Sequence, residues 1–351
     1  MNQIEAPEFE ALIREERVHW IDVRAPIEFG SGAMPEAINL PLLTNEERHT
    51  IGLLYRNEGK EAAIEMGHKL VSGEIRKARI KSWTQEVRAN PRTVIYCFRG
   101  GMRSQIVQAW LKKESGIDVP ILSGGYKALR RFLIEQTEIL ANSMNFTLIS
   151  GPTGSGKTQY LKTSGVAYLD LEALARHRGS AFGAYEEALQ PCQADFENAL
   201  AVNLIRLSKV PGPILLEAES RMIGARALPE VLFHKMCVSQ RVPLEVPIDE
   251  RVENIFKDYI LDGSLGRLGS QKPFETFRNA VLAISQKLGV LRAQEITEDL
   301  NRSQKDFLDG MGLGSNRIWI RKLLVYYYDP LYAKAAIKNR AKINDLLKEE
   351  S

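Results

Sequence analysis

Two short motifs in this chain of 351 residues combine residue types that could perform chemistry. The first is CFRGGMR at residues 97–103, in which a cysteine is followed by glycines and arginines. The second is GPTGSGKT at residues 151–158, a glycine-rich run that ends in lysine and threonine. One motif offers a nucleophilic thiol and the other a loop for phosphate groups, so the segments that position them decide what the chain can do.

Cys97 directly follows the β-branched segment TVIY at residues 93–96, and a helix-prone segment comes after its loop. The two glycines of the loop let it curl so that its backbone N–H groups point inward. The helix N-terminus, Arg99 and Arg103 add positive potential, which favours a thiolate at Cys97. The same donors would hold an anionic group on the sulfur, such as a persulfide, selenide or phosphate. We therefore predict Cys97, Arg99 and Arg103 as catalytic residues.

Residues 151–158 match the pattern G-x-x-x-x-G-K-[S/T] between a strand-like segment, FTLIS, and a helix-prone segment. Backbone amides of such a loop cradle phosphates, while its lysine reaches a terminal phosphate and its hydroxyl can hold Mg²⁺. The pattern does not specify which diphosphate is bound, and ATP or GTP is the default. The predicted diphosphate-binding residues are Gly151, Gly154, Ser155, Gly156, Lys157 and Thr158.

Acidic residues follow two other strand-like segments in this half of the chain. Asp170 follows VAYL and is predicted to be catalytic, either at Mg²⁺ or as a base; a helix N-cap is an equal alternative. Glu217 and Glu219 follow ILL and are candidate Mg²⁺ ligands or bases, with a solvated turn as the alternative. No firm metal site follows from these residues alone.

Strand-like and helix-prone segments alternate in both halves, which predicts parallel α/β sheets. We expect an N-terminal α/β domain at residues 1–133, a helical linker at 134–145, a P-loop α/β domain at 146–275 and a helical region at 276–351. Residues 45–90 form a long charged, helix-prone insertion in the first domain. A further strand is expected at residues 244–248.

The composition is that of a globular protein, with 44% apolar and 26% charged residues and a net charge of +3. This mildly basic balance permits a nucleic-acid partner without requiring one. No apolar run approaches the ~20 residues that span a bilayer, and the N-terminal residues lack the features of a signal peptide. The three cysteines, at 97, 192 and 237, form no disulfide or zinc pattern. We therefore predict a cytoplasmic protein with no membrane partner.

The first domain resembles the rhodanese family over roughly residues 5–133. The resemblance rests on IDVR at 21–24, AINLP at 37–41, the Cys97 loop and LSGG at 122–125. It implies that Cys97 is a nucleophile that carries a chalcogen, and that Asp22 and Arg24 have a structural role. Five residues separate Cys97 from Arg103, a longer loop that resembles those of rhodanese-related phosphatases.

The phosphate loop resembles that of tRNA dimethylallyltransferases, which hold a prenyl diphosphate there. Over most of its length the chain resembles the tRNA 2-selenouridine synthase family, in the segments CFRGGMRSQ, LSGGYKALR, GPTGSGKT, YLDLEALARHRGSAFG and LLEAESRMIG. This resemblance implies that wobble 2-thiouridine in tRNA is first geranylated with geranyl diphosphate at the P-loop domain. Selenium supplied from selenophosphate and carried on Cys97 then replaces the S-geranyl group. A selenophosphate-supplying enzyme would be a further partner, and Mg²⁺ a candidate cofactor.

Basic residues that could contact the tRNA lie in both halves of the first domain: Arg76, Lys77, Arg79, Lys81, Lys127, Arg130 and Arg131. The run RIWIRKLLVYYY at 317–328 could stack bases, although a helix core is the preferred interpretation. Two alternatives remain open at this point. One is a nucleotide-coupled tRNA sulfurtransferase, and the other is a CX5R phosphatase fused to a kinase-like domain.

Overall fold

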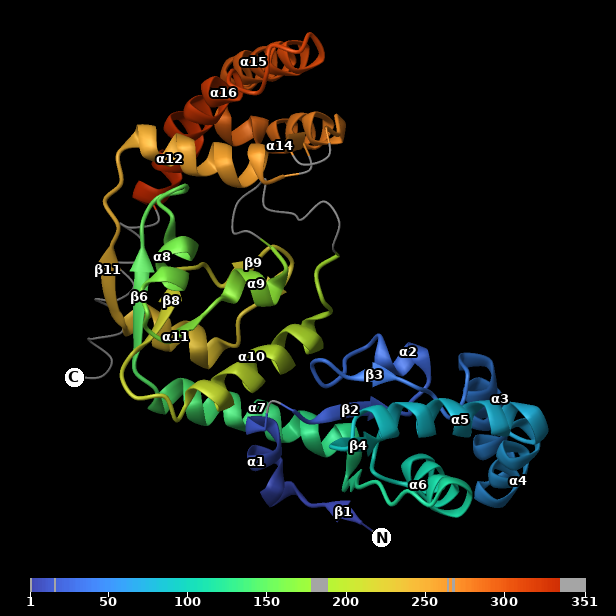
Figure 1. Ribbon diagram of the computed structural model, residues 1–351. Helices are drawn as coiled ribbons and strands as arrows, with labels where there is room; N and C mark the ends of the chain where they lie inside the picture. The colour runs from blue at the N-terminus through green and yellow to red at the C-terminus, as the bar shows by residue number, and fades with distance from the viewer. Residues whose placement is uncertain (1, 16, 178–188, 264, 267–268, 335–351) are drawn as a thin grey trace. The chain divides into compact units, whose positions relative to one another are not determined.

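The computed structural model describes residues 2–15, 17–177, 189–263, 265–266 and 269–334 of the chain (Figure 1). They form two compact units, each with its own sheet. Unit 1 comprises Met1–Ser143 and Pro191–Val210, and unit 2 comprises Met144–Gln190 and Pro211–Ser351. Residues 191–210, which the sequence placed inside the P-loop domain, therefore pack with unit 1. Among the described residues, no helix is long and apolar enough to cross a bilayer.

Unit 1 is built on a parallel sheet with the strand order β1-β5-β4-β2-β3. Its strands are β1 (Gln3–Ile4), β2 (His19–Asp22), β3 (Ile38–Asn39), β4 (Thr93–Tyr96) and β5 (Ile121–Leu122). All four residues of β4, at the centre of the sheet, are buried. A central parallel strand is covered on both faces, which explains why TVIY shows no polar alternation.

Helices cover this sheet and supply the insertion at residues 45–90. They are η1 (Ala6–Glu8), α1 (Phe9–Arg14), α2 (Pro26–Phe29), α3 (Asn45–Glu58), α4 (Lys60–Leu70), α5 (Gly73–Ala89), α6 (Met102–Ser115), α7 (Gly125–Ser143) and α10 (Gln193–Leu207). α10 packs along α7 and α1. Its residues Ala201, Val202 and Ile205 share a hydrophobic core with Leu129 and Leu133 of α7, so unit 1 is completed by a distant segment.

Unit 2 contains a four-stranded parallel sheet with the order β11-β6-β8-β7. The strands are β6 (Phe146–Ser150), β7 (Tyr168–Leu169), β8 (Ile214–Glu217) and β11 (Gln240–Pro243), and a short antiparallel ribbon joins β9 (Met222–Ile223) to β10 (Arg226–Ala227). The strand expected at residues 244–248 was wrong, since β11 ends at Pro243.

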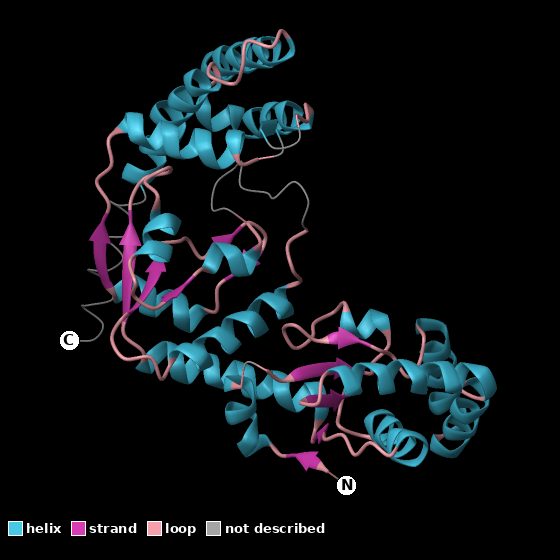
Figure 2. Ribbon diagram, in the orientation of Figure 1, coloured by secondary structure: helices cyan, strands magenta, loops and turns pink. Residues whose placement is uncertain are grey.

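The helices of unit 2 divide into those beside the sheet and those at the carboxyl ends of its strands. Beside the sheet lie α8 (Lys157–Thr163), α9 (Leu171–Ala175) and α11 (Glu230–Val238). The C-terminal helices are α12 (Ile248–Ile255), η2 (Phe256–Leu261), α14 (Lys272–Leu288), α15 (Val290–Leu308), α16 (Asn316–Leu323) and η3 (Leu324–Tyr328). Figure 2 shows the arrowheads of the two leftmost strands, β6 and β11, pointing towards α12.

The predicted fold class is confirmed: two α/β units on parallel sheets are followed by helices. The C-terminal helices have their own core, which begins at Val252 and ends at Tyr327. Trp319, Ile320 and Leu323 of the aromatic run are buried in it. These residues of the run therefore belong to a helix core, which is the interpretation that the sequence favoured over a surface for stacking bases.

Candidate functional site

Cys97 lies at the carboxyl end of the central strand β4, where the loop to α6 begins. Its side chain is buried, with 3% exposed, and its Sγ lies 3.3 Å from the Ser104 hydroxyl. The thiol also faces the Gly101 carbonyl at 3.7 Å, to which Ser104 donates at 3.1 Å. Because a hydroxyl can rotate, Ser104 can instead donate to a thiolate or to an anion attached to it. Sequence reasoning did not single out Ser104.

The Cys97 loop is packed directly against the turn that follows β5. A Cβ on Gly100 would lie 2.5 Å from the Gly124 nitrogen, and a Cβ on Gly125 would lie 2.4 Å from the Cys97 carbonyl oxygen. Gly100, Gly124 and Gly125 have positive φ values of +61°, +68° and +57°. The Tyr126 N–H also donates to the Cys97 carbonyl at 2.8 Å. The LSGG segment therefore acts as a brace that fixes the course of the cysteine loop.

The two arginines of the motif have different surroundings. Arg99 is exposed, and its guanidinium lies 5.7 Å from the centre of the Phe98 ring. Arg103 forms a two-pronged ion pair with Glu28 at 2.6 and 3.1 Å, and Glu28 also binds Arg48 at 3.0 Å. Burial raises the pKa of Glu28, but the hydrogen bond and charges of its arginines lower it by more. Arg103 therefore does not direct an uncompensated charge at Cys97, because Glu28 balances it.

Asp22 and Arg24 form a buried ion pair beneath this loop, at 2.6 Å. Arg24 also donates to the Gly32 carbonyl at 2.7 Å, and its guanidinium lies 4.1 Å from the centre of the Tyr126 ring. Every charged group here is paired inside the unit, as a buried ion must be. The geometry agrees with the structural role expected for both residues.

The phosphate loop connects β6 to α8 with the backbone shape that its glycines predict. Gly154 and Gly156 have φ values of +82° and +73°, and a Cβ on Gly151 would lie 2.5 Å from the Ser155 hydroxyl. The Lys157 ammonium donates to the Gly151 carbonyl at 3.1 Å, across the mouth of its own loop. The buried Ser155 Oγ has no hydrogen-bond partner among the described residues. A bound phosphate oxygen would give the Ser155 hydroxyl a partner.

Two residues of α12 hold the outer side of this loop, and sequence reasoning missed both. Arg251 donates to the Thr153 carbonyl at 2.9 Å, and Asn254 donates to the Gly154 carbonyl at 2.9 Å. Arg251 is itself fixed by Asp329, with a shortest separation of 2.6 Å. The carbonyls of Thr153 and Gly154 are thus turned towards α12, while within the loop the Ser155 N–H donates to the Pro152 carbonyl at 3.1 Å.

Three carboxylates gather at the carboxyl edge of the sheet of unit 2. One oxygen from each of Glu172, Glu217 and Glu219 lies within 4.8 Å of the others. Burial raises the pKa of Glu217, opposed by a hydrogen bond from Thr158, and burial raises the pKa of Glu219 to about 7. The buried Glu217 Oε1 has no hydrogen-bond partner among the described residues.

These carboxylates fit a hard divalent cation. Oxygen ligands from carboxylates and a hydroxyl are those that Mg²⁺ prefers, and a cation would offset the burial of Glu217. Glu172, which sequence reasoning missed, lies only two residues beyond Asp170 in the chain. Asp170 itself caps α9, accepting from the Ala173 N–H at 2.9 Å, and lies 3.7 Å from the Lys162 ammonium. Its N-cap role is therefore present, and its catalytic role stays a prediction.

Several basic residues predicted to contact tRNA are paired within unit 1. Arg79 forms an ion pair with Glu47 at 2.8 Å, and Arg130 binds Glu197 and donates to Asn198. Arg131 is exposed and pairs with Glu135 at 2.7 Å. The run RHRGS at residues 176–180 has a basic composition that could contact phosphate or RNA, and from residue 178 onward it lies outside the described residues.

Comparison with known proteins agrees with both halves of the site. A family model described as the tRNA 2-selenouridine synthase AAA domain matches residues 144–350, and one for the rhodanese-like domain matches residues 5–131. The tRNA 2-selenouridine synthase of Bdellovibrio bacteriovorus is 44% identical over 338 residues, covering 91% of this chain and 89% of that protein. That of Nitrosomonas europaea is 43% identical over 346 residues, covering 91% and 89%. With both units matched in order along the chain, this protein belongs to the tRNA 2-selenouridine synthase family.

Proposed function

We propose that this member of the family converts wobble 2-thiouridine of tRNA to 2-selenouridine in two steps, one in each unit. The observation that carries the proposal is the presence of two complete and different sites. Unit 1 holds a buried thiol braced by glycines, and unit 2 holds a phosphate loop beside a carboxylate cluster. A single-step exchange would use only one of them.

The first step is alkylation at the phosphate loop. The sulfur of 2-thiouridine attacks C1 of geranyl diphosphate, a C–S bond forms, the C–O bond to the diphosphate breaks and the N3 proton is lost. Lys157 and the N–H groups of the loop stabilise the charge that collects on the departing pyrophosphate. When bound by Glu172, Glu217 and Glu219 with the Thr158 hydroxyl, a Mg²⁺ ion supplies further stabilisation of that charge.

The second step is selenium exchange at Cys97. The selenium of selenophosphate, held in the Cys97 loop, attacks C2 of the nucleoside; the C–Se bond forms, the C–S bond breaks and geranylthiol leaves with a proton from the Cys97 thiol. Ser104, 3.3 Å from the sulfur, is placed to donate to the anion. Water then attacks phosphorus and the P–Se bond breaks, which releases phosphate and leaves 2-selenouridine without a change of oxidation state.

The order of the steps follows from leaving-group chemistry. Sulfur doubly bonded to a ring carbon leaves poorly, whereas alkylation turns it into a thiol leaving group. The tRNA must therefore visit the phosphate loop before Cys97. An enzyme that makes selenophosphate is the expected partner for the second visit.

The test is mass spectrometry of 2-thiouridine tRNA incubated with geranyl diphosphate, then with selenophosphate. A geranyl adduct that becomes 2-selenouridine supports the proposal. Lys157→Ala should slow adduct formation by about 10²–10³-fold. Cys97→Ala should form the adduct and incorporate no selenium. Loss of both steps in a folded Cys97→Ala protein would contradict the division of labour, and tRNA-stimulated ATP hydrolysis without an adduct would favour the nucleotide-coupled sulfurtransferase.

A further inference from the structure

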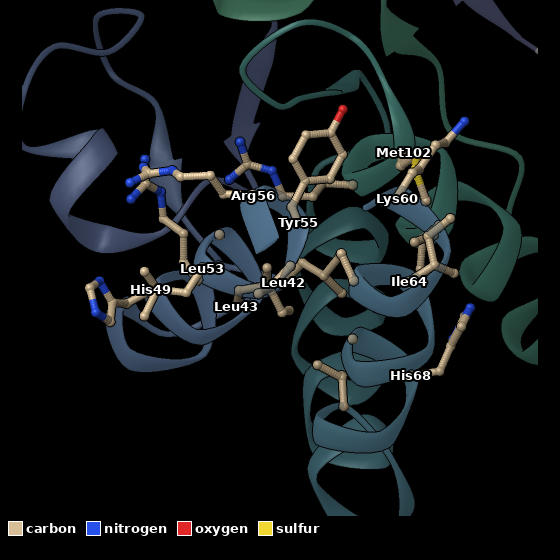
Figure 3. Close-up of a pocket in the computed structure, with 18 of the residues that line it drawn as sticks. Leu42, Leu43, His49, Leu53, Tyr55, Arg56, Lys60, Ile64, His68 and Met102 are labelled. Atoms are coloured by element: carbon tan, nitrogen blue, oxygen red, sulfur yellow. The ribbon is translucent and has the colours of Figure 1, made fainter. Parts of the chain in front are cut away.

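A cavity of about 490 Å³ lies in unit 1 beside the Cys97 loop (Figure 3). Its walls come from α3, α4 and α6, so it is formed largely by the insertion at residues 45–90. Figure 3 shows His49 and Leu53 on one side, Ile64 and His68 on the other, and Leu42 and Leu43 between them.

The interior of the cavity is apolar although it opens to solvent. Leu42 and Leu43 are buried at its base, whereas Leu53, Tyr55 and Met102 are large side chains with 40% or more of their surface exposed. Water must contact this surface when the cavity is empty. A hydrocarbon ligand that displaced the water would bind more tightly by roughly fourfold for each buried methylene.

The charged residues that line the cavity are all basic. Arg48, Arg56, Lys60 and Arg103 line it together with two histidines, and no aspartate or glutamate does. Glu28 pairs with Arg48 and Arg103, but the described residues provide no ion-pair partner for Arg56 or Lys60. In a chain with 44 acidic and 47 basic residues, this one-sided lining favours a ligand that joins a hydrocarbon to anionic groups.

The cavity and the thiol site share residues. Met102 and Arg103 belong to the cysteine motif and also line the cavity. Leu42, Leu43 and Val71 line it and pack in the same core cluster as Cys97. A hydrocarbon held here would therefore lie next to the cysteine loop.

We propose that this cavity binds the geranyl chain of S-geranylated tRNA while C2 of the modified nucleoside is presented to Cys97, with Arg56 and Lys60 contacting RNA phosphates. The identity of the hydrocarbon rests on the proposed function. The volume lies in the range of ligand pockets that enclose small organic groups. The location in unit 1 assigns the cavity to the exchange step, since the phosphate loop that would hold geranyl diphosphate is in unit 2.

Gly52 of α3 provides a way to fill the cavity. It lines the cavity, and a Cβ built on it meets no heavy atom within 4 Å. Gly52→Phe should therefore occupy the space without displacing the backbone. Thr50→Phe adds the same side chain to an exposed position of the same helix outside the lining, which makes it a matched control.

The experiment measures binding of the full-length variants to three synthetic anticodon stem-loops that carry 2-thiouridine, S-methyl-2-thiouridine or S-geranyl-2-thiouridine. Wild type and Thr50→Phe should prefer the geranyl RNA over the methyl RNA by at least about tenfold. Gly52→Phe should remove that preference and slow selenium exchange on geranyl RNA. Because the RNAs are prepared chemically, this result does not depend on whether the protein alkylates tRNA.

Three outcomes would overturn the proposal. An intact geranyl preference in Gly52→Phe would show that the chain binds elsewhere. A loss of alkylation by geranyl diphosphate with unchanged binding of geranyl RNA would assign the cavity to the free diphosphate. If Gly52→Phe unfolds, Leu53→Asn supplies the same test at a partly exposed position, and an unchanged preference there would be equally contrary.

Arg56 and Lys60, which we call the rim of the cavity, allow a separate prediction in the same assay. Arg56→Gln combined with Lys60→Gln should weaken binding of all three stem-loops by a similar factor and reduce the salt dependence of binding. Interior and rim changes thus act on different quantities: the interior sets the preference for the geranyl group, and the rim sets affinity for RNA. A rim variant that changed only the geranyl preference would contradict this division.

Discussion

Glu28 on α2 holds Arg103 in the first turn of α6 through hydrogen bonds of 2.6 and 3.1 Å. The two residues are 75 positions apart, yet this pair fixes the beginning of the helix that follows the cysteine loop. Both side chains are largely buried, with 12% and 22% exposed, so the pair is not a solvated surface contact.

This ion pair predicts a pH-dependent stability. Burial raises the pKa of Glu28 but Arg103 and Arg48 lower it below its ordinary value of 4.5. The ion pair of Glu28 therefore stabilises the folded state fully above pH 4.5. This contribution to the free energy of unfolding is lost as the pH falls through the lower pKa that Glu28 has in the folded protein. In urea denaturation at about pH 7, Glu28→Gln should be less stable than wild type by about 1–3 kcal/mol. The difference should shrink towards about pH 3, and an equal difference at both pH values would indicate packing rather than charge.

Gly125→Ala should disrupt the brace on the cysteine loop. The new Cβ would lie 2.4 Å from the Cys97 carbonyl oxygen, so the two loops must separate. We expect a loss of stability above about 2 kcal/mol and loss of selenium incorporation, with alkylation retained. Gly116→Ala is the matched control, because its φ is +68° but no heavy atom lies within 4 Å of the Cβ. It should cost only about 1 kcal/mol of strain and leave selenium incorporation unchanged.

Ser104→Ala removes the hydroxyl 3.3 Å from the Cys97 sulfur. Since a hydrogen bond to a charged group contributes about 1.5–3 kcal/mol, selenium exchange should slow by about 10- to 100-fold. Exchange is measured on S-geranyl RNA so that alkylation does not limit the rate. Ser82→Ala, at an exposed position of α5, should exchange at the wild-type rate. Equal rates in all three proteins would mean that Ser104 acts only in packing.

Removal of divalent metal should slow alkylation and leave selenium exchange unaffected. The carboxylate cluster of Glu172, Glu217 and Glu219 lies in unit 2, whereas Cys97 lies in unit 1. Glu217→Gln should raise the Mg²⁺ concentration needed for half-maximal alkylation by about tenfold or more. Alkylation that persists at full rate in EDTA would show that Lys157 and the loop amides suffice.

Arg251→Met should loosen the phosphate loop from outside. The change removes the hydrogen bond to the Thr153 carbonyl and leaves Asp329 without its partner. We expect a loss of about 1–3 kcal/mol in the free energy of unfolding and a raised KM for geranyl diphosphate. Arg321→Met is the control, because it breaks an exposed ion pair with Asp249, which lies on α12 like Arg251. It should change neither the free energy of unfolding nor the KM by a comparable amount. A stability loss without a change in KM would assign Arg251 to folding alone.

The sequence predicted what depends on contiguous residues. The segments TVIY and FTLIS are strands β4 and β6, and each is followed at once by its chemical loop. Strand, glycine-rich loop and helix follow one another within a few residues, so no long-range pairing was needed to foresee them. The family and the α/β class were predicted for the same reason and are confirmed.

What the sequence did not reveal depends on distant packing. Glu28 and Arg251 reach the sites only through the tertiary fold, and Glu172, although it lies in a segment that resembles the family, meets Glu217 and Glu219 only at the edge of the folded sheet. The strand expected at 244–248 was wrong because LEVPI alternates in polarity, whereas the actual strand QRVP does not. β11 is an edge strand, and a proline at the end of an edge strand costs no ladder hydrogen bond.

The excursion of α10 into unit 1 constrains how such a protein can have arisen. The protein chain passes from one unit to the other at residues 143–144, 190–191 and 210–211. A fragment ending at residue 143 would expose Leu129 and Leu133, and a fragment beginning at residue 144 would carry the complementary face of α10 uncovered. A gene fusion at one junction would therefore not have produced two finished halves. Recombination that replaced one unit would have to exchange the chain at all three junctions. The thiol site and the phosphate loop are therefore expected to be inherited together.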